Sequence, residues 1–102
     1  MAAEPRFDES IHASTRLRLC AVLRPLDSAE FRVLINILGM SEASLSKTIR
    51  ILVELGYATT SKQPSPQRDD RRLTTTVQLT PTGKMAFDGH LAAISALADS
   101  NQ

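Results

Sequence analysis

A chain of 102 residues has the length of one domain, and its 42% hydrophobic and 23% charged residues are close to the averages of soluble globular proteins. This composition excludes a collagen-like chain, a disulfide-stabilised miniprotein and a wholly disordered tail. The formal net charge of +1 says little about partners when it is taken alone.

The cysteine count and the hydropathy pattern indicate the cellular setting. One cysteine cannot form an internal disulfide, and with two histidines it does not comfortably complete a tetrahedral zinc site. No apolar run reaches the roughly 18 residues of a membrane span, and residues 1–6 lack the apolar core of a secretory signal. We therefore expect a reduced, cytoplasmic protein with no metal, no cofactor and no contact with a membrane.

The charges are unevenly distributed along the chain. Residues 58–84 carry five basic side chains and two aspartates, a net charge of +3, whereas residues 85–102 carry two aspartates and no base, a net charge of −2. This asymmetry is a weak indication of an anion-binding surface in the middle of the chain.

The first helix is predicted to run from Asp8 to Leu23. Residues 1–7 are expected to form a flexible N-terminal arm, and residues 8–102 a single domain. Apolar side chains recur along one side of the predicted helix, and Pro25 ends it.

A second helix is predicted to open a helix-turn-helix that spans residues 27–56. Asp27 and Glu30 have the spacing of a capping box, and apolar residues then recur at the helical spacing from Phe31 onward. Gly39 is expected to end this helix because it takes the left-handed conformation easily.

A third helix is predicted to begin at the N-cap Ser41 and to end at Gly56. Its buried stripe is expected to consist of Leu45, Ile49, Leu52 and Val53. The opposite face carries small, polar and basic side chains, which is typical of the second helix of a DNA-binding helix-turn-helix.

The segment 57–80 is predicted to be a β-hairpin. Tyr57–Lys62 reads as a short strand, and Leu73–Thr80 alternates strictly between two faces and has high β-propensity. The loop between them, residues 63–72, is polar, basic and contains prolines. A strand, a basic loop and a strand after a helix-turn-helix form the winged-helix arrangement.

The last element is predicted to be a helix over residues 81–99, with Thr80 as N-cap and Pro81 at its first position. Its apolar face is wider than a small core needs, so part of it is expected to meet another chain. The predicted dimer interface is Ile11, Leu19, Phe87, His90, Leu91, Ile94, Leu97 and Ala98. The predicted fold class is α+β, mainly α: a winged helix-turn-helix with a β-hairpin wing and a C-terminal dimerisation helix.

Three segments, in this order, resemble one-domain winged-helix transcriptional regulators of the MarR/ArsR-like kind. They are residues 11–20, residues 44–57 and residues 79–84. The middle segment, Ser-Leu-Ser-Lys-Thr-Ile-Arg-Ile-Leu-Val-Glu-Leu-Gly-Tyr, resembles the recognition-helix pattern of the family, and the last, Leu-Thr-Pro-Thr-Gly-Lys, resembles its entry into the helix after the wing. The resemblance covers residues 11–98. It implies a homodimeric, sequence-specific DNA-binding regulator, most commonly a repressor at a roughly palindromic operator.

The resemblance also bears on metal sensing and on catalysis. Members that sense metals carry clusters of cysteine, histidine and aspartate on the helices, whereas this sequence offers only Cys20, His12 and His90. Metal sensing is therefore not expected. The resemblance gives no support to an enzyme, and no catalytic spacing accompanies the serines and histidines.

The predicted DNA contacts lie on the third helix and the wing. Short side chains allow a helix to approach base edges, and lysine or arginine reaches phosphates or guanine. The helix N-terminus adds a partial positive charge for a phosphate. The predicted set is Ser41, Glu42, Ser44, Ser46, Lys47, Thr48, Arg50, Lys62, Arg68, Arg71 and Arg72.

Several alternatives remain beside this interpretation. The same face would serve a winged-helix protein-interaction module without direct DNA readout, and the wing aspartates Asp69 and Asp70 favour that option.

Cys20 is expected to be a buried structural thiol rather than a redox switch. Both histidines are expected to be structural, with His90 at a dimer interface as the alternative. An unidentified small-molecule effector would bind at the interface or under the wing.

Overall fold

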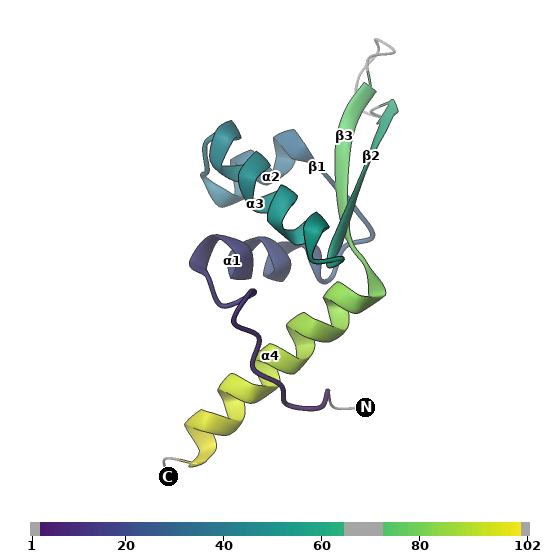
Figure 1. Ribbon diagram of the computed structural model, residues 1–102. Helices are drawn as coiled ribbons and strands as arrows, with labels where there is room; N and C mark the ends of the chain where they lie inside the picture. The colour runs from purple at the N-terminus through teal and green to yellow at the C-terminus, as the bar shows by residue number, and fades with distance from the viewer. Residues whose placement is uncertain (1–2, 65–72, 101–102) are drawn as a thin grey trace.

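The computed structural model describes residues 3–64 and 73–100 of the chain (Figure 1). The elements, in order, are α1 (Ser14–Leu23), β1 (Ala29–Glu30), α2 (Phe31–Leu38), α3 (Glu42–Glu54), β2 (Ala58–Pro64), β3 (Leu73–Leu79) and α4 (Pro81–Ser100). The strands form an antiparallel sheet in the order β1-β3-β2. This mainly helical winged helix, with its β-hairpin and C-terminal helix, confirms the predicted fold class.

The predicted start of the first helix is wrong by six residues, because α1 begins at Ser14 and not at Asp8. The Asp8 side chain instead closes a turn, in which its Oδ1 accepts a hydrogen bond from the Ile11 N–H at 3.0 Å. Aspartate readily makes such side-chain-to-backbone turns, which compete with a helical start. Ile11 therefore reaches the core from a turn rather than from the helix.

The predicted capping box at Asp27 and Glu30 is also wrong. Glu30 is the N-cap residue of α2, but no side chain caps this helix, which begins at Phe31. Ala29 and Glu30 form the short strand β1, which pairs with Val77 and Thr76 of β3. The backbone pairing with β3 and the burial of Ala29 explain why this segment is extended.

The two glycines that end helices behave as expected. Gly39 follows α2 with φ of 64°, and Gly56 follows α3 with φ of 77°, both in the left-handed region. The predicted N-cap of α3 is confirmed, because Ser41 Oγ accepts a hydrogen bond from the Ser44 N–H at 3.1 Å.

The β2–β3 hairpin forms a long two-stranded ribbon that extends beyond the helices (Figure 1). Its register pairs Ala58 with Leu79 at the base and Pro64 with Leu73 at the far end. Ala58, Val77 and Leu79 are buried at the base, whereas Leu73 is 59% exposed because no helix covers the far end. The predicted alternation of the second strand therefore holds only where the strand meets the core.

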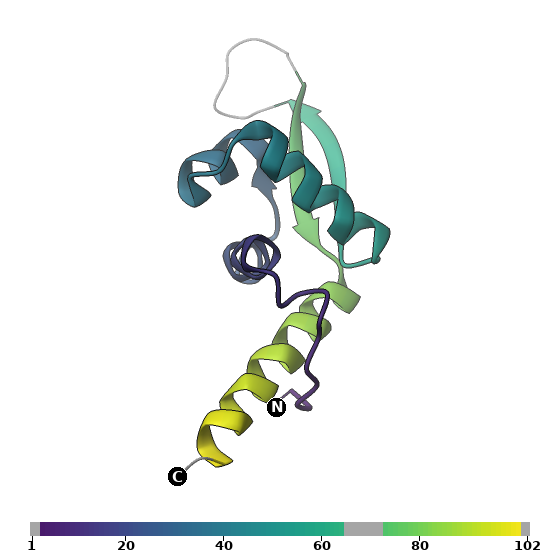
Figure 2. The same ribbon diagram turned by 60° about the vertical axis from the view of Figure 1, so that its left-hand side comes forward.

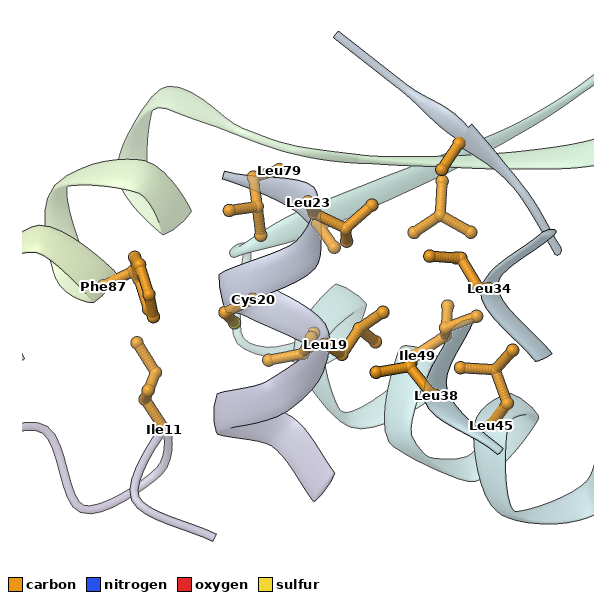
Figure 3. Packing of buried hydrophobic residues seen from close by; sticks show 14 residues of the cluster. Ile11, Leu19, Cys20, Leu23, Leu34, Leu38, Leu45, Ile49, Leu79 and Phe87 are labelled. Atoms are coloured by element: carbon orange, nitrogen blue, oxygen red, sulfur yellow. The ribbon is translucent and has the colours of Figure 1, made fainter. Parts of the chain in front are cut away.

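The hydrophobic core lies around α1. Leu19, Cys20 and Leu23 of this helix lie between Phe87 of α4 on one side and the α2 and α3 side chains on the other (Figure 3). All three are completely buried. Each fully buried leucine contributes roughly 1.5–3 kcal/mol to folding. The core thus fixes α3 relative to the rest of the domain.

The first half of α4 packs against the body of the domain, and its second half extends away from it (Figures 1 and 2). Arg24, just after α1, forms a 2.8 Å ion pair with Asp88 of α4. The N-terminal arm runs alongside α4, and the Arg6 N–H donates a hydrogen bond to the Gly89 carbonyl at 2.9 Å. A Cβ at Gly89 would lie 3.0 Å from the Glu4 carbonyl oxygen, so the close approach of the arm favours glycine at this position.

None of the helices in the described ranges is long and apolar enough to cross a membrane.

Candidate nucleic-acid interface

The outward face of α3 presents polar and basic side chains to solvent. The helical repeat that buries Leu45, Ile49 and Leu52 turns Ser46, Lys47 and Arg50 outward, where all three are exposed. Two exposed cations beside a short hydroxyl side chain can contact both phosphates and base edges. This face of α3 is hereafter called the recognition face.

Side chains of the chain itself already interact with the N-terminus of α3. Ser41 Oγ is engaged by the Ser44 N–H, and Glu42 places a carboxylate in the first turn. That carboxylate interacts favourably with the helix dipole and weakens the positive potential available to a phosphate. Both residues are exposed, whereas Ser44 is half-buried.

Thr48 is a correction to the predicted contact set. Its side chain is 4% exposed, and its Oγ1 donates a hydrogen bond to the Ser44 carbonyl at 2.9 Å within the helix. The hydroxyl is therefore satisfied by the backbone of the preceding turn and faces away from solvent. Thr48 supports the helix and presents no group to DNA.

The recognition face continues into the hairpin through a cleft of about 440 Å³. The lining side chains come from the start of α2, from α3 and from both hairpin strands: Phe31, Ser46, Ile49, Arg50, Val53, Thr60 and Thr75. Sequence reasoning missed Phe31, Thr60 and Thr75, because their meeting depends on how the hairpin lies against α3. The cleft makes α3 and the hairpin one continuous surface.

The wing supplies one described basic side chain. Lys62 lies on β2, opposite Thr75 of β3, and is exposed. The other predicted wing contacts, Arg68, Arg71 and Arg72, lie outside the described residues. Nearby, Ser61 and Thr76 form a cross-strand hydrogen bond of 2.8 Å between their hydroxyls, which holds the ribbon in register.

A hydrogen bond from α1 supports the helix-turn-helix formed by α2 and α3. The Arg18 guanidinium of α1 donates a 2.8 Å hydrogen bond to the carbonyl of Leu38, the last residue of α2. The C-terminal carbonyls of a helix lack partners within the helix, so this bond satisfies one of them beside Gly39. It joins α1 to the turn that sets the angle between α2 and α3.

A second junction fixes the other end of α3. The Tyr57 hydroxyl donates a 2.7 Å hydrogen bond to Asp8 Oδ2, and the Thr80 N–H donates to the Tyr57 carbonyl at 3.0 Å. A Cβ at Gly83 would clash with that same carbonyl, so α4 packs directly on the backbone there. The bond to Asp8 raises the pKa of Tyr57 to about 12. Sequence reasoning missed both Tyr57 and Asp8.

Four residues of the predicted dimer interface belong to the core of the single chain. Ile11, Leu19, Phe87 and His90 are at most 5% exposed, so they offer no surface to a second copy. Phe87 and His90 are buried because the arm and α1 cover the first half of α4, whereas Ile11 and Leu19 belong to the hydrophobic core around α1. The other four lie in the second half of α4: Leu91 is 44% exposed, Leu97 is 59% exposed, Ile94 is half-buried and Ala98 is exposed.

The cysteine and the histidines do not assemble into a metal site. Among the described residues, no group of three histidine, cysteine or acidic side chains is placed to hold a metal ion. Cys20 is fully buried, and burial, together with the nearby Asp8 carboxylate, raises the pKa of its thiol to about 11. The thiol is therefore uncharged and shielded, which agrees with a structural role.

Comparisons with known proteins agree with this geometry. A family model described as a winged helix DNA-binding domain matches residues 15–98. A transcriptional regulator homologue from Pyrococcus horikoshii OT3 superposes with a TM-score of 0.82 at 22% identity, over 93% of this chain and 90% of that one. No curated protein sequence matches the chain.

Two further solved structures were determined with bound molecules. A point mutant of MarR from E. coli, complexed with operator DNA, has a TM-score of 0.62 and 19% identity over 86% of this chain. NadR in complex with 4-hydroxyphenylacetate has a TM-score of 0.69 and 17% identity over 90% of this chain. This chain spans 60% of the MarR chain and 62% of the NadR chain. The expected resemblance to winged-helix regulators is confirmed.

Proposed function

We propose that this chain, which belongs to the family of winged helix DNA-binding domains, is a transcriptional regulator that places α3 in the major groove of DNA. The observation that carries the proposal is the recognition face, where Ser46, Lys47 and Arg50 are exposed on a helix capped at Ser41. The cleft that joins this face to the hairpin supports a wing contact with the same duplex. The chain acts by binding and not by catalysis.

The regulator is proposed to work as a homodimer on a roughly palindromic operator, where it represses by covering a promoter. The exposed apolar side chains of the second half of α4 support this assembly, because they extend beyond the core of one chain. Two domains related by a two-fold axis read two half-sites about one helical turn apart.

A small-molecule effector is part of the proposal. A cleft of about 810 Å³ lies between the arm and α4, with Phe7, Tyr57 and Met85 among its lining residues. Its size and its mixture of apolar and polar side chains suit a small organic molecule. NadR, which shares the fold, was solved with 4-hydroxyphenylacetate.

The proposal is tested by selecting bound fragments from a genomic library and measuring their affinity over a salt series. Lys47→Ala and Arg50→Ala should each weaken binding to every sequence and reduce the slope of log K against log salt by about one. Lys84→Ala removes the same charge from α4, where Lys84 lines the cleft beside the N-terminal arm and not the cleft beside α3, and should leave affinity and slope unchanged.

The alternative is a protein-interaction module that uses the same face without DNA readout. It predicts no salt-dependent binding to any fragment. Unchanged affinity and slope in both the Lys47 and the Arg50 variant would remove the role proposed for α3.

A further inference from the structure

A cluster of Phe7, Asp8, His12 and His90 joins the N-terminal arm to α4, and DNA binding gives it no role. His90 lies on α4 and is completely buried, whereas His12 precedes α1 and is exposed. The Nδ1 atom of His12 lies 3.2 Å from the Nε2 atom of His90. The Phe7 ring packs against both imidazoles, with centroids 4.9 Å from His12 and 4.6 Å from His90. This cluster is hereafter called the arm latch.

The hydrogen bonds of the arm latch define the protonation state of His90. The Asp8 backbone N–H donates to His90 Nδ1 at 3.0 Å, so Nδ1 must carry a lone pair. The proton of the neutral ring is then on Nε2, from which it is donated to His12 Nδ1. A protonated His90 would direct a second N–H at the Asp8 N–H, and a backbone amide cannot become an acceptor.

The surroundings of His90 reinforce this preference for the neutral ring. Burial, followed by the proximity of His12, lowers the pKa of His90, and the carboxylates of Asp8 and Glu9 only partly oppose this effect. The Asp8 carboxylate is already engaged, with Oδ1 accepting from the Ile11 N–H and Oδ2 from the Tyr57 hydroxyl.

The remaining titratable and charged groups close to the latch do not compensate a buried cation. The Cys20 thiol on α1 stays neutral because burial raises its pKa to about 11. Arg6 of the arm is itself positively charged. Arg24, just after α1, and Asp88 of α4, two residues before His90, are paired with each other.

We propose that the arm latch is a pH-sensitive device in which protonation of His90 releases the N-terminal arm from α4. The closed form requires neutral His90, whereas the released form exposes the ring to water and accepts a proton at the ordinary pKa near 6.5. The released form therefore binds more protons below that pH. Acidification shifts the equilibrium toward release by up to about tenfold per pH unit, until the closed form also protonates.

Release of the arm affects more than the latch itself. The arm holds α4 through the Arg6–Gly89 hydrogen bond, and Asp8 connects the arm to Tyr57, three residues after the end of α3. An open latch therefore frees both the arm-facing side of α4 and the C-terminal support of α3. Release of the arm involves the arm and α4 and does not depend on DNA binding.

The test follows the arm and His90 together in one titration of the full chain. A nitroxide attached through Ala3→Cys broadens the NMR signal of the Gly89 amide while the arm lies on α4, and ¹⁵N-labelled imidazoles report the protonation of His90. We expect a neutral His90 with its proton on Nε2 at pH 7.5, and a loss of broadening below pH 6.5 in step with His90 protonation. Broadening that persists to pH 5.0 would overturn the proposal.

His90→Asn is the matched variant, because its side-chain oxygen can accept from the Asp8 N–H near the position of Nδ1 but does not titrate. Its arm should stay on α4 from pH 7.5 to pH 5.0. Release of the arm in this variant over the same pH range as in wild type would assign the effect to another group and refute the proposal. If the variant does not fold, the wild-type titration still shows whether the arm is released as His90 becomes protonated.

Discussion

At the scale of single residues, the ionisation of Tyr57 reports on its contact with Asp8 after the end of α3. Its hydrogen bond to Asp8 raises the pKa of the phenol to about 12. A raised pKa favours the neutral phenol in the folded state, so the stabilisation is complete below about pH 10 and is lost as the pH rises toward 12. The chain has one tyrosine and no tryptophan, so phenolate absorbance reports this residue alone.

We predict that the phenolate of the folded chain appears with a midpoint near pH 12, and that Asp8→Asn moves the midpoint toward 10. Tyr57→Phe should lower the free energy of unfolding by about 1.5–3 kcal/mol, because the bond that it removes involves a charged acceptor. A wild-type midpoint near 10 would show that the Tyr57–Asp8 bond does not form.

Neighbouring hydroxyls on α3 should differ sharply in their effect on DNA binding. Thr48→Val keeps the shape of a side chain whose hydroxyl bonds only to the helix backbone, so affinity should not change and stability should change by less than about 1 kcal/mol. Ser46→Val removes an exposed hydroxyl from the recognition face and should weaken operator binding severalfold. Gel-shift titration and urea unfolding of both variants check this, and a binding defect in the Thr48 variant would contradict the buried placement.

At the scale of elements, two of the predicted helix caps give a second matched pair. Ser41→Ala should lower the free energy of unfolding by about 1 kcal/mol, because Ser41 caps α3 through the Ser44 N–H. Asp27→Ala should change it by less than about 0.5 kcal/mol, because Asp27 is exposed and caps no helix. Urea unfolding measures both, and equal losses would mean that the α2 start is capped after all.

Local patterns predicted those elements whose signals lie within one segment. The N-cap and apolar repeat of α3, the β-propensity of β3 and the Thr80–Pro81 start of α4 each stand in a few consecutive residues. β1 was missed because a two-residue strand has no pattern of its own, and its pairing with Val77 joins segments far apart in the chain. The Asp8 turn was missed because the same residue type also begins helices.

The features of the candidate site likewise fall into those that local patterns predict and those that depend on contacts between distant segments. The outward direction of Lys47 and Arg50 follows from helical periodicity, which the sequence contains. The burial of Thr48 follows from the same periodicity, because it lies three residues after Leu45 and four before Leu52; only its polar side chain suggested a DNA contact. The cleft beside the hairpin depends on how the hairpin lies against α3, which the sequence does not display. His90 was placed at an interface because the apolar face of α4 gave no sign that residues 4–8 would cover its first half.

At the scale of the whole molecule, the two halves of α4 differ in how far they are buried. Its first half is covered by the arm and α1, where Phe87 and His90 are at most 5% exposed. Its second half extends away from the body and carries Leu91 and Leu97, which are 44% and 59% exposed. A single chain gains nothing from an extended apolar helix end, whereas a pair of chains can bury it.

We therefore predict a two-fold symmetric homodimer held by the second half of α4. Leu97→Glu should yield a folded monomer, because the side chain is exposed and lies outside the core, and operator affinity should fall by at least tenfold as the two half-sites are no longer linked. Phe87→Glu is the contrasting variant, since it buries a charge in the core and should unfold the chain. Sedimentation at micromolar concentration, with circular dichroism to monitor folding, separates the two effects, and a wild-type chain that sediments as an 11.2 kDa monomer would exclude the dimer.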